Sequence, residues 1–97
     1  MTPYITRRNL QYHEIIGLRV RVLQYSDPQL VGLEGVVVDE TLKTLVVEKH
    51  GGARIRVFKS QAVFEFKLPS GEAAVIRGDN LIGRPWDRLK KVLISRR

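Results

Sequence analysis

Apolar and polar residues alternate with a period of two over most of the chain before residue 78. The clearest example is Leu18–Val22, where three apolar residues alternate with Arg19 and Arg21. Such alternation places successive side chains on opposite faces of a strand. Turn signals, including Ser-Asp-Pro at 26–28 and His-Gly-Gly at 50–52, separate these segments. The pattern predicts six strands: Leu18–Val22, Leu33–Asp39, Leu45–Lys49, Ala53–Lys59, Ala62–Leu68 and Glu72–Arg77.

Six short strands joined by tight turns predict a mainly β protein built as a small antiparallel barrel. Two short helices are expected to flank the strands. Asn9 and Gly17 are suited to begin and end a helix over Gln11–Ile16. Near the other end, Pro85 suits a first helical position and Asp87 a first turn. One face of this second helix is expected to pack on the barrel or on a partner: Trp86, Leu89 and Leu93.

The length of 97 residues is that of one small domain. Residues 1–8 lack a periodic pattern and are predicted to form a flexible basic arm, with a single domain over residues 9–97. The chain has no cysteine, which excludes disulfides and thiolate metal sites. No apolar run reaches the length of a membrane span, and a signal-peptide core is missing. We therefore expect a soluble, cytoplasmic protein that does not bind membranes.

The charge of the chain indicates its class of partner. Seventeen Lys and Arg residues against ten acids give a net charge of +7. Residues 69–97 carry seven basic and three acidic residues, so this third is the most basic part. An excess of this size on a small domain favours nucleic acid as the partner.

Candidate catalytic groups do not form a constellation in the sequence. His13 and His50 stand alone, and no serine lies in a nucleophile motif. Asp39 and Glu40 are adjacent in a strand and point to opposite faces, so they are interpreted as hairpin residues and not as a magnesium site. The motifs of RRM and KH domains are missing as well. No catalytic residue and no metal ligand is predicted in this chain.

Basic residues on strand faces and on the last helix remain as the candidate RNA-binding set. Such groups contact phosphates and fix position without reading sequence. The predicted set is Arg19, Arg21, Arg54, Arg56, Lys59, Arg77, Arg84, Arg88, Lys90 and Lys91.

Four segments carry a resemblance to a known family. GLRVRV, VGLEGVVVDETLKTLVV, ARIRVFKSQAVFEF and IRGDNLIGRPWDRLKK resemble archaeal ribonuclease P protein component 1. The resemblance spans about Ile16 to Lys91. Its most specific parts are GxVVDET, followed by a short turn and Leu-Val, and the closing GDxLxxRPxDRxKK.

The resemblance implies a six-stranded Sm-like barrel with terminal helices. It implies a subunit of ribonuclease P, the endoribonuclease that removes the 5′ leader of precursor tRNA, in which the RNA is the catalyst. Such a subunit is monomeric alone, binds the ribonuclease P RNA, pairs with a zinc-ribbon protein subunit, and meets precursor tRNA only indirectly. No cofactor is expected on this chain, and Mg²⁺ is expected at the RNA. The predicted contacts with the protein partner are Leu10, Val36, Val38, Trp86 and Leu89.

Other small barrels remain open as alternatives. A ring-forming Sm-like RNA-binding protein is one, although Gly35 and Asp39 lie closer together than in Sm proteins, and Thr44 replaces the usual asparagine. A KOW-type ribosomal RNA-binding protein is another, and an SH3-like protein-interaction module without an RNA role is a third.

Overall fold

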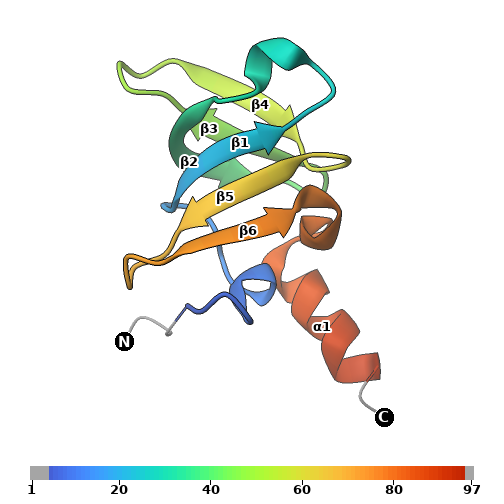
Figure 1. Ribbon diagram of the computed structural model, residues 1–97. Coiled ribbons are helices and arrows are strands. Elements are labelled where there is room, and N and C mark those ends of the chain that lie inside the picture. Colours follow the sequence, from blue (N-terminus) through green and yellow to red (C-terminus); the bar gives the residue numbers. More distant parts are fainter. Residues whose placement is uncertain (1–4, 96–97) are drawn as a thin grey trace.

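Six antiparallel strands form one sheet in the computed structural model, which describes the backbone of residues 5–95 and the side chains of residues 5–90 (Figure 1). The strands lie in the order β4-β3-β2-β1-β5-β6. Each strand agrees with its predicted bounds to within two residues, so the mainly β prediction is confirmed. The bounds are β1 (Arg19–Gln24), β2 (Glu34–Glu40), β3 (Thr44–Glu48), β4 (Arg54–Phe58), β5 (Val63–Lys67) and β6 (Ala73–Arg77).

The sheet is strongly curled, because β4 and β5 are distant in the strand order but adjacent in the chain. Four strand spacings would put their ends about 19 Å apart in a flat sheet. The connection from Phe58 to Val63 is too short and too tightly turned for that distance, since the N–H of Ala62 donates to the carbonyl of Lys59 (3.2 Å). The edges of the described sheet are β4 and β6, and no pairing between these two strands closes a ring.

The concave side of the sheet holds the hydrophobic core. Phe64 and Phe66 are fully buried, with ring centroids 6.0 Å apart. Alternate residues of the other strands join them, as the period of two predicts, and Leu10, Ile15 and Leu81 enter from the flanking segments. The arginines that alternate with core residues in β1 and β4 are exposed. Burial on one face only therefore fixes which side of each strand is available to a partner.

A bulge in β2 changes which residues of that strand face the core. Val37 lies opposite Val47, but Asp39 lies opposite Val46, so Val38 is an extra residue in the ladder. An extra residue reverses the alternation that follows it. Val37 and Glu40 are consequently both buried, while Asp39 is exposed.

The predicted N-terminal helix is present but shorter than the expected span Gln11–Ile16. The structure has one 3₁₀ turn, η1 (Leu10–Tyr12), and Asn9 makes no side-chain cap to it. Ile15 is fully buried in the core, and the N–H of Gly17 donates to the carbonyl of Val37 (2.8 Å). This segment leaves the helical path because it delivers the chain into β1.

The other flanking elements follow the turn signals of the sequence. A 3₁₀ turn, η2 (Pro28–Leu30), begins at Asp27, whose carboxylate accepts from the N–H of Gln29. After β6 the chain forms η3 (Gly78–Leu81) and then the predicted C-terminal helix, α1 (Pro85–Ser95). Helix α1 lies against η1 at the end of the sheet near β6, so the two terminal segments of the described chain meet (Figure 1).

Gly78 supplies a test of this packing. A Cβ atom at this position would overlap the carbonyl oxygen of Lys59 and contact the ring of Phe64. Gly78→Ala should therefore cost about 3 kcal/mol of unfolding free energy, the upper range for overpacking. Gly17→Ala is the control, because its space is open although φ is +96°; it should cost only about 1–2 kcal/mol. Urea denaturation measures both, and equal losses would show that the contact with Lys59 is not limiting.

Candidate nucleic-acid interface

The predicted basic residues divide into exposed and buried groups. Those that alternate with core residues, and those beyond the last strand, reach solvent because the sheet buries only one face. The exposed members are Arg19, Arg21, Arg54, Arg56, Arg77, Arg84 and Lys90. Lys91 lies in α1, and its side chain is outside the described residues.

Several exposed arginines already have acidic neighbours. Arg54 donates to Glu48 at 2.9 Å, and Arg77 lies 3.7 Å from Asp79. Arg56 instead donates to the hydroxyl oxygen of Thr44 at 3.0 Å. Exposed ion pairs of this kind contribute about 0–1 kcal/mol to stability. Their main consequence here is that the positive charge of the surface is partly neutralised where the acids stand.

Lys59 and Arg88 are not on the surface, which corrects their assignment to the RNA-binding set. Lys59 is 0% exposed and Arg88 is 4% exposed. Both point to Glu40, whose Oε2 accepts from Lys59 Nζ at 2.7 Å and from Arg88 at 2.7 Å. Groups enclosed in this way cannot reach a phosphate. We call these three residues the buried ionic cluster.

The lysine of the cluster also closes the turns around it. Lys59 Nζ donates to the carbonyl oxygens of Thr41 (2.8 Å) and Gly83 (2.9 Å), with that of Leu42 at 3.3 Å. An ammonium group has three hydrogens to donate. The carboxylate of Glu40 and two carbonyls therefore satisfy it, and the β2–β3 turn becomes tied to the segment before α1.

The arginine of the cluster connects both terminal segments to the sheet. Its guanidinium donates to Glu40, to the carbonyls of Leu81 (3.0 Å) and Gly83 (2.6 Å), and across to η1. On that side it contacts the carbonyl of Gln11 and donates to the carbonyl of His13 at 3.0 Å. The planar fork of arginine suits several acceptors at once. Arg88 thus holds α1 and η1 together.

Burial sets the electrostatics of the cluster. Desolvation lowers the pKa of Lys59, and the hydrogen bond and charge of Glu40 oppose this effect, while Arg88 adds to it. Two cations share one carboxylate, and Oε1 of Glu40 has no hydrogen-bond partner among the described residues. The cluster therefore depends on Glu40 as its single source of negative charge.

One sequence signal bears on this cluster. Lys59 follows Ile55 and Val57 at a spacing of two, so it continues the inner face of β4 one residue beyond the end of the strand. On α1, Arg88 is buried and Leu89 is half-buried, while Trp86 is 61% exposed, so the predicted stripe does not pack on the barrel as one face. The side chain of Leu93, the third member of that stripe, is outside the described residues. No comparable signal marks Glu40, since the bulge at Val38 is not visible in the sequence pattern.

The predicted protein-contact residues also divide. Leu10 is 1% exposed and belongs to the core, so its assignment to a partner surface is corrected. Val36, Val38 and Leu89 are half-buried, and Trp86 is exposed. The valines lie on β2 and the other two on α1, and both elements are tied to Glu40 and Arg88. Four of the five residues thus remain available for a contact.

The described residues contain no group of three or more histidine, aspartate or glutamate side chains that could hold a metal ion. Among the described helices, none combines the length and hydropathy that crossing a bilayer requires. The candidate site is therefore the outer face of the sheet with its exposed cations, together with α1, which the buried ionic cluster fixes relative to the sheet.

Comparison with known proteins identifies the family. Residues 8–91 match the model of the family described as ribonuclease P/MRP, subunit p29. The chain belongs to this family. It is 64% identical over 88 residues to ribonuclease P protein component 1 of Desulfurococcus amylolyticus, covering 91% of this chain and 96% of that protein. Its identity to the protein of the same name from Staphylothermus marinus is 53%, with the same coverage.

A solved structure of a p29 family relative supports the fold. Mth11, a homologue of human RNase P protein Rpp29, is 45% identical to this chain and superposes with a TM-score of 0.59, covering 78% of this chain and 97% of that one. The resemblance stated from the sequence is therefore confirmed, as is the fold class. Ring-forming Sm-like and KOW-type proteins are not favoured as alternatives.

The role of Glu40 in this p29 family member can be tested by removing its charge. Glu40→Gln leaves two buried cations without a counter-charge and should cost about 3–5 kcal/mol of unfolding free energy. Asp39→Asn is the matched control, because Asp39 is the exposed neighbour in the same strand; it should change stability by less than about 0.5 kcal/mol. Urea denaturation gives both values, and a loss as small as that of the control would contradict a structural role for the cluster.

Proposed function

We propose that this chain is a protein subunit of an archaeal ribonuclease P and stabilises the folded, substrate-binding form of its RNA during removal of the 5′ leader from precursor tRNA. The observation that carries the proposal is the family match over residues 8–91, nearly the whole described chain. The exposed cations of the outer sheet face support it, because they suit a polyanion.

The proposed contribution of the protein is electrostatic and mechanical. Compaction of a large RNA brings phosphates together against their mutual repulsion, and fixed cations lower that cost. The chemistry is then supplied by the RNA and the Mg²⁺ ions bound to it. On this proposal the chain needs neither a catalytic residue nor a metal ligand of its own.

The proposed RNA face consists of the exposed members of the predicted set. Lys59 and Arg88 support it indirectly, since they fix α1 relative to the sheet. Arg84, directly before α1, and Lys90, within α1, are thereby held in place. A preorganised surface of this kind loses less entropy when it binds than a flexible one.

For the protein partner we propose a zinc-ribbon subunit docked on β2 and α1. Strand β2 is paired on both sides, with β1 and with β3, so a partner cannot add a strand to it. Contact must be made by side chains, of which Val36 and Val38 are half-buried and apolar. Trp86 is a further exposed apolar residue, on α1. The cytoplasm is part of the same proposal as the compartment of this complex.

Reconstitution tests the proposed function. The protein, an archaeal zinc-ribbon subunit and the ribonuclease P RNA of a source such as Desulfurococcus amylolyticus should cleave precursor tRNA at a lower Mg²⁺ concentration than the RNA alone. The measurement is the initial cleavage rate across a Mg²⁺ titration, with each protein omitted in turn. Identical Mg²⁺ dependence with and without this protein would refute the proposal.

The partner surface can be tested separately. Val36→Lys with Val38→Lys should weaken heterodimer formation at least tenfold, because two lysines would have to be desolvated in an apolar contact. Val31→Lys with Val75→Lys is the matched control, since both valines are exposed and neither belongs to β2 or α1. Calorimetric titration gives the affinities, and thermal unfolding checks that both variants fold. Equal affinity of the two variants would exclude β2 as the contact.

A further inference from the structure

The outer faces of four neighbouring strands form two parallel rows of side chains with different charges. Strand register defines the rows, since residues that are Cα partners lie side by side across the sheet. The first row is Val36, Arg19, Lys67 and Ala73, and the second row is Glu34, Arg21, Glu65 and Val75.

The second row holds two acids and one arginine, whereas the first row holds two cations and no acid. Arg21 stands between Glu34, with which it forms an ion pair at 3.3 Å, and Glu65. Arg19 and Lys67 are direct cross-strand neighbours and both exposed, and neither forms an ion pair with any described residue. Like charges placed directly opposite each other repel. The first row is therefore a place where the folded protein holds positive charge without a counter-charge.

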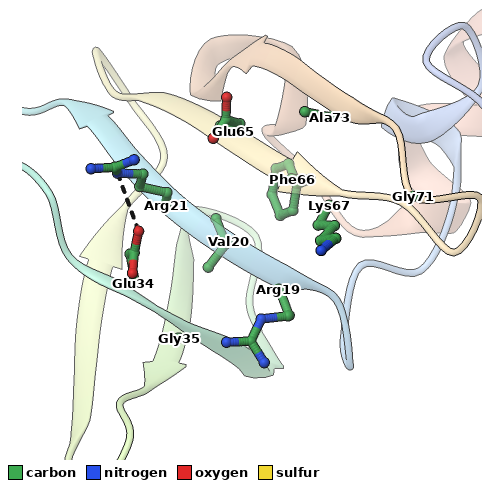
Figure 2. A pocket seen from close by; sticks show the side chains of 10 residues that line it. All are labelled: Arg19, Val20, Arg21, Glu34, Gly35, Glu65, Phe66, Lys67, Gly71 and Ala73. Atoms are coloured by element: carbon green, nitrogen blue, oxygen red, sulfur yellow. Dashed lines mark ion pairs between the residues drawn. The ribbon is translucent and has the colours of Figure 1, made fainter.

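The space around this cation pair is open. A groove of about 260 Å³ runs along β1 and β5 and includes Arg19 and Lys67 in its lining (Figure 2). Small residues at its margin, Gly35, Gly71 and Ala73, leave room beside the two cations. Gly35 cannot be enlarged, because a Cβ atom there would overlap the carbonyl oxygen of Glu48.

We propose that Arg19 and Lys67 together bind a phosphate of the RNA backbone, and that this groove is a specific contact within the RNA face. The inference rests on the proposed function and narrows it to one place on the sheet. A guanidinium and an ammonium on adjacent strands offer donors to one phosphate from two sides. Lys67 was not among the residues predicted from the sequence.

The other features of the groove favour an RNA backbone over a base or a protein segment. Its one aromatic lining residue, Phe66, is fully buried, so no ring is available to stack on a base. Glu34 and Glu65 of the second row repel a phosphate that moves toward Arg21. They confine the bound backbone to the first row, so the site fixes position without reading sequence.

The exposed arginines at the ends of other strands differ from this pair. Arg54 and Arg77 each have an acid within ion-pair distance, so a phosphate would have to compete with Glu48 or Asp79. Such competition reduces the binding free energy that each contact between arginine and phosphate contributes. The Arg19–Lys67 pair has no such competitor and should contribute more to RNA binding than its share of the total charge.

Salt dependence of RNA binding distinguishes a site from a general charge effect. Arg19→Ala with Lys67→Ala should reduce the slope of log K against log salt by about 0.7–0.9, the value for one phosphate contact. Lys43→Ala with Lys49→Ala is the matched control. It removes the same charge from exposed turn lysines that form no ion pair in the described chain, and its slope should change by less than half as much. Equal changes in the two variants would overturn the proposal.

A second measurement locates the contact directly. The chain has no cysteine, so Lys67→Cys introduces a single thiol to which an iron chelate can be attached. Hydroxyl radicals generated there should cut the ribonuclease P RNA at one localised region, and the chelate on Lys49→Cys should give no cuts in that region. Cuts spread evenly along the RNA, or the same cuts from both positions, would overturn the proposal.

The possible failures are separable. If the wild-type protein does not bind the RNA, the proposed function fails and this inference fails with it. If the wild type binds and the Arg19–Lys67 variant behaves as its control does, only the inference fails. Weakened binding to the zinc-ribbon subunit in the absence of RNA, with RNA affinity unchanged, would show that the groove is a protein contact and refute the phosphate site.

Discussion

The carboxylate of Glu40 is the point on which the arrangement of this domain depends. One oxygen accepts from both Lys59 and Arg88 at 2.7 Å, in the interior of the protein. These three residues come from the end of β2, the β4–β5 connection and α1, and Arg88 extends the network to η1. Segments that are distant in the sequence are therefore fixed relative to one another by a single negative charge.

A buried ionic cluster often stabilises a protein no more than apolar residues of the same size would. The cluster matters in this protein because it donates hydrogen bonds to the backbone carbonyls around it. The carbonyls of Thr41, Leu81, Gly83 and His13 belong to turns and segment ends, and the cluster supplies donors to them. Buried carbonyls need such partners, and leucine or methionine offers none. The two cations thus allow irregular segments to pack against the end of the sheet.

Sequence reasoning recovered what depends on local pattern. The six strands were predictable because core residues recur at every second position and turns, most of them containing glycine, separate the strands. Two errors and one missed residue have a common origin in tertiary contacts. Leu10 is buried by the sheet end, Glu40 is turned inward by the bulge at Val38, and Arg88 faces the core because its acceptors lie there. A one-dimensional pattern does not contain these partners, although the spacing of Lys59 from Val57 indicates its inward direction.

The difference between buried and exposed cations also affects how the net charge is interpreted. Of the +7, the buried cluster holds +1, and that share is not available to a partner. Several surface arginines are neutralised by an acid on the adjacent strand or turn, so composition overstates the positive surface. Strand register then decides where unpaired charge remains, because it sets Arg19 beside Lys67 and sets Arg21 between two glutamates. An RNA backbone that binds this domain is therefore positioned by the few cations that lack a counter-charge. The position of α1, fixed by the buried ionic cluster, determines which further cations can contact the same RNA.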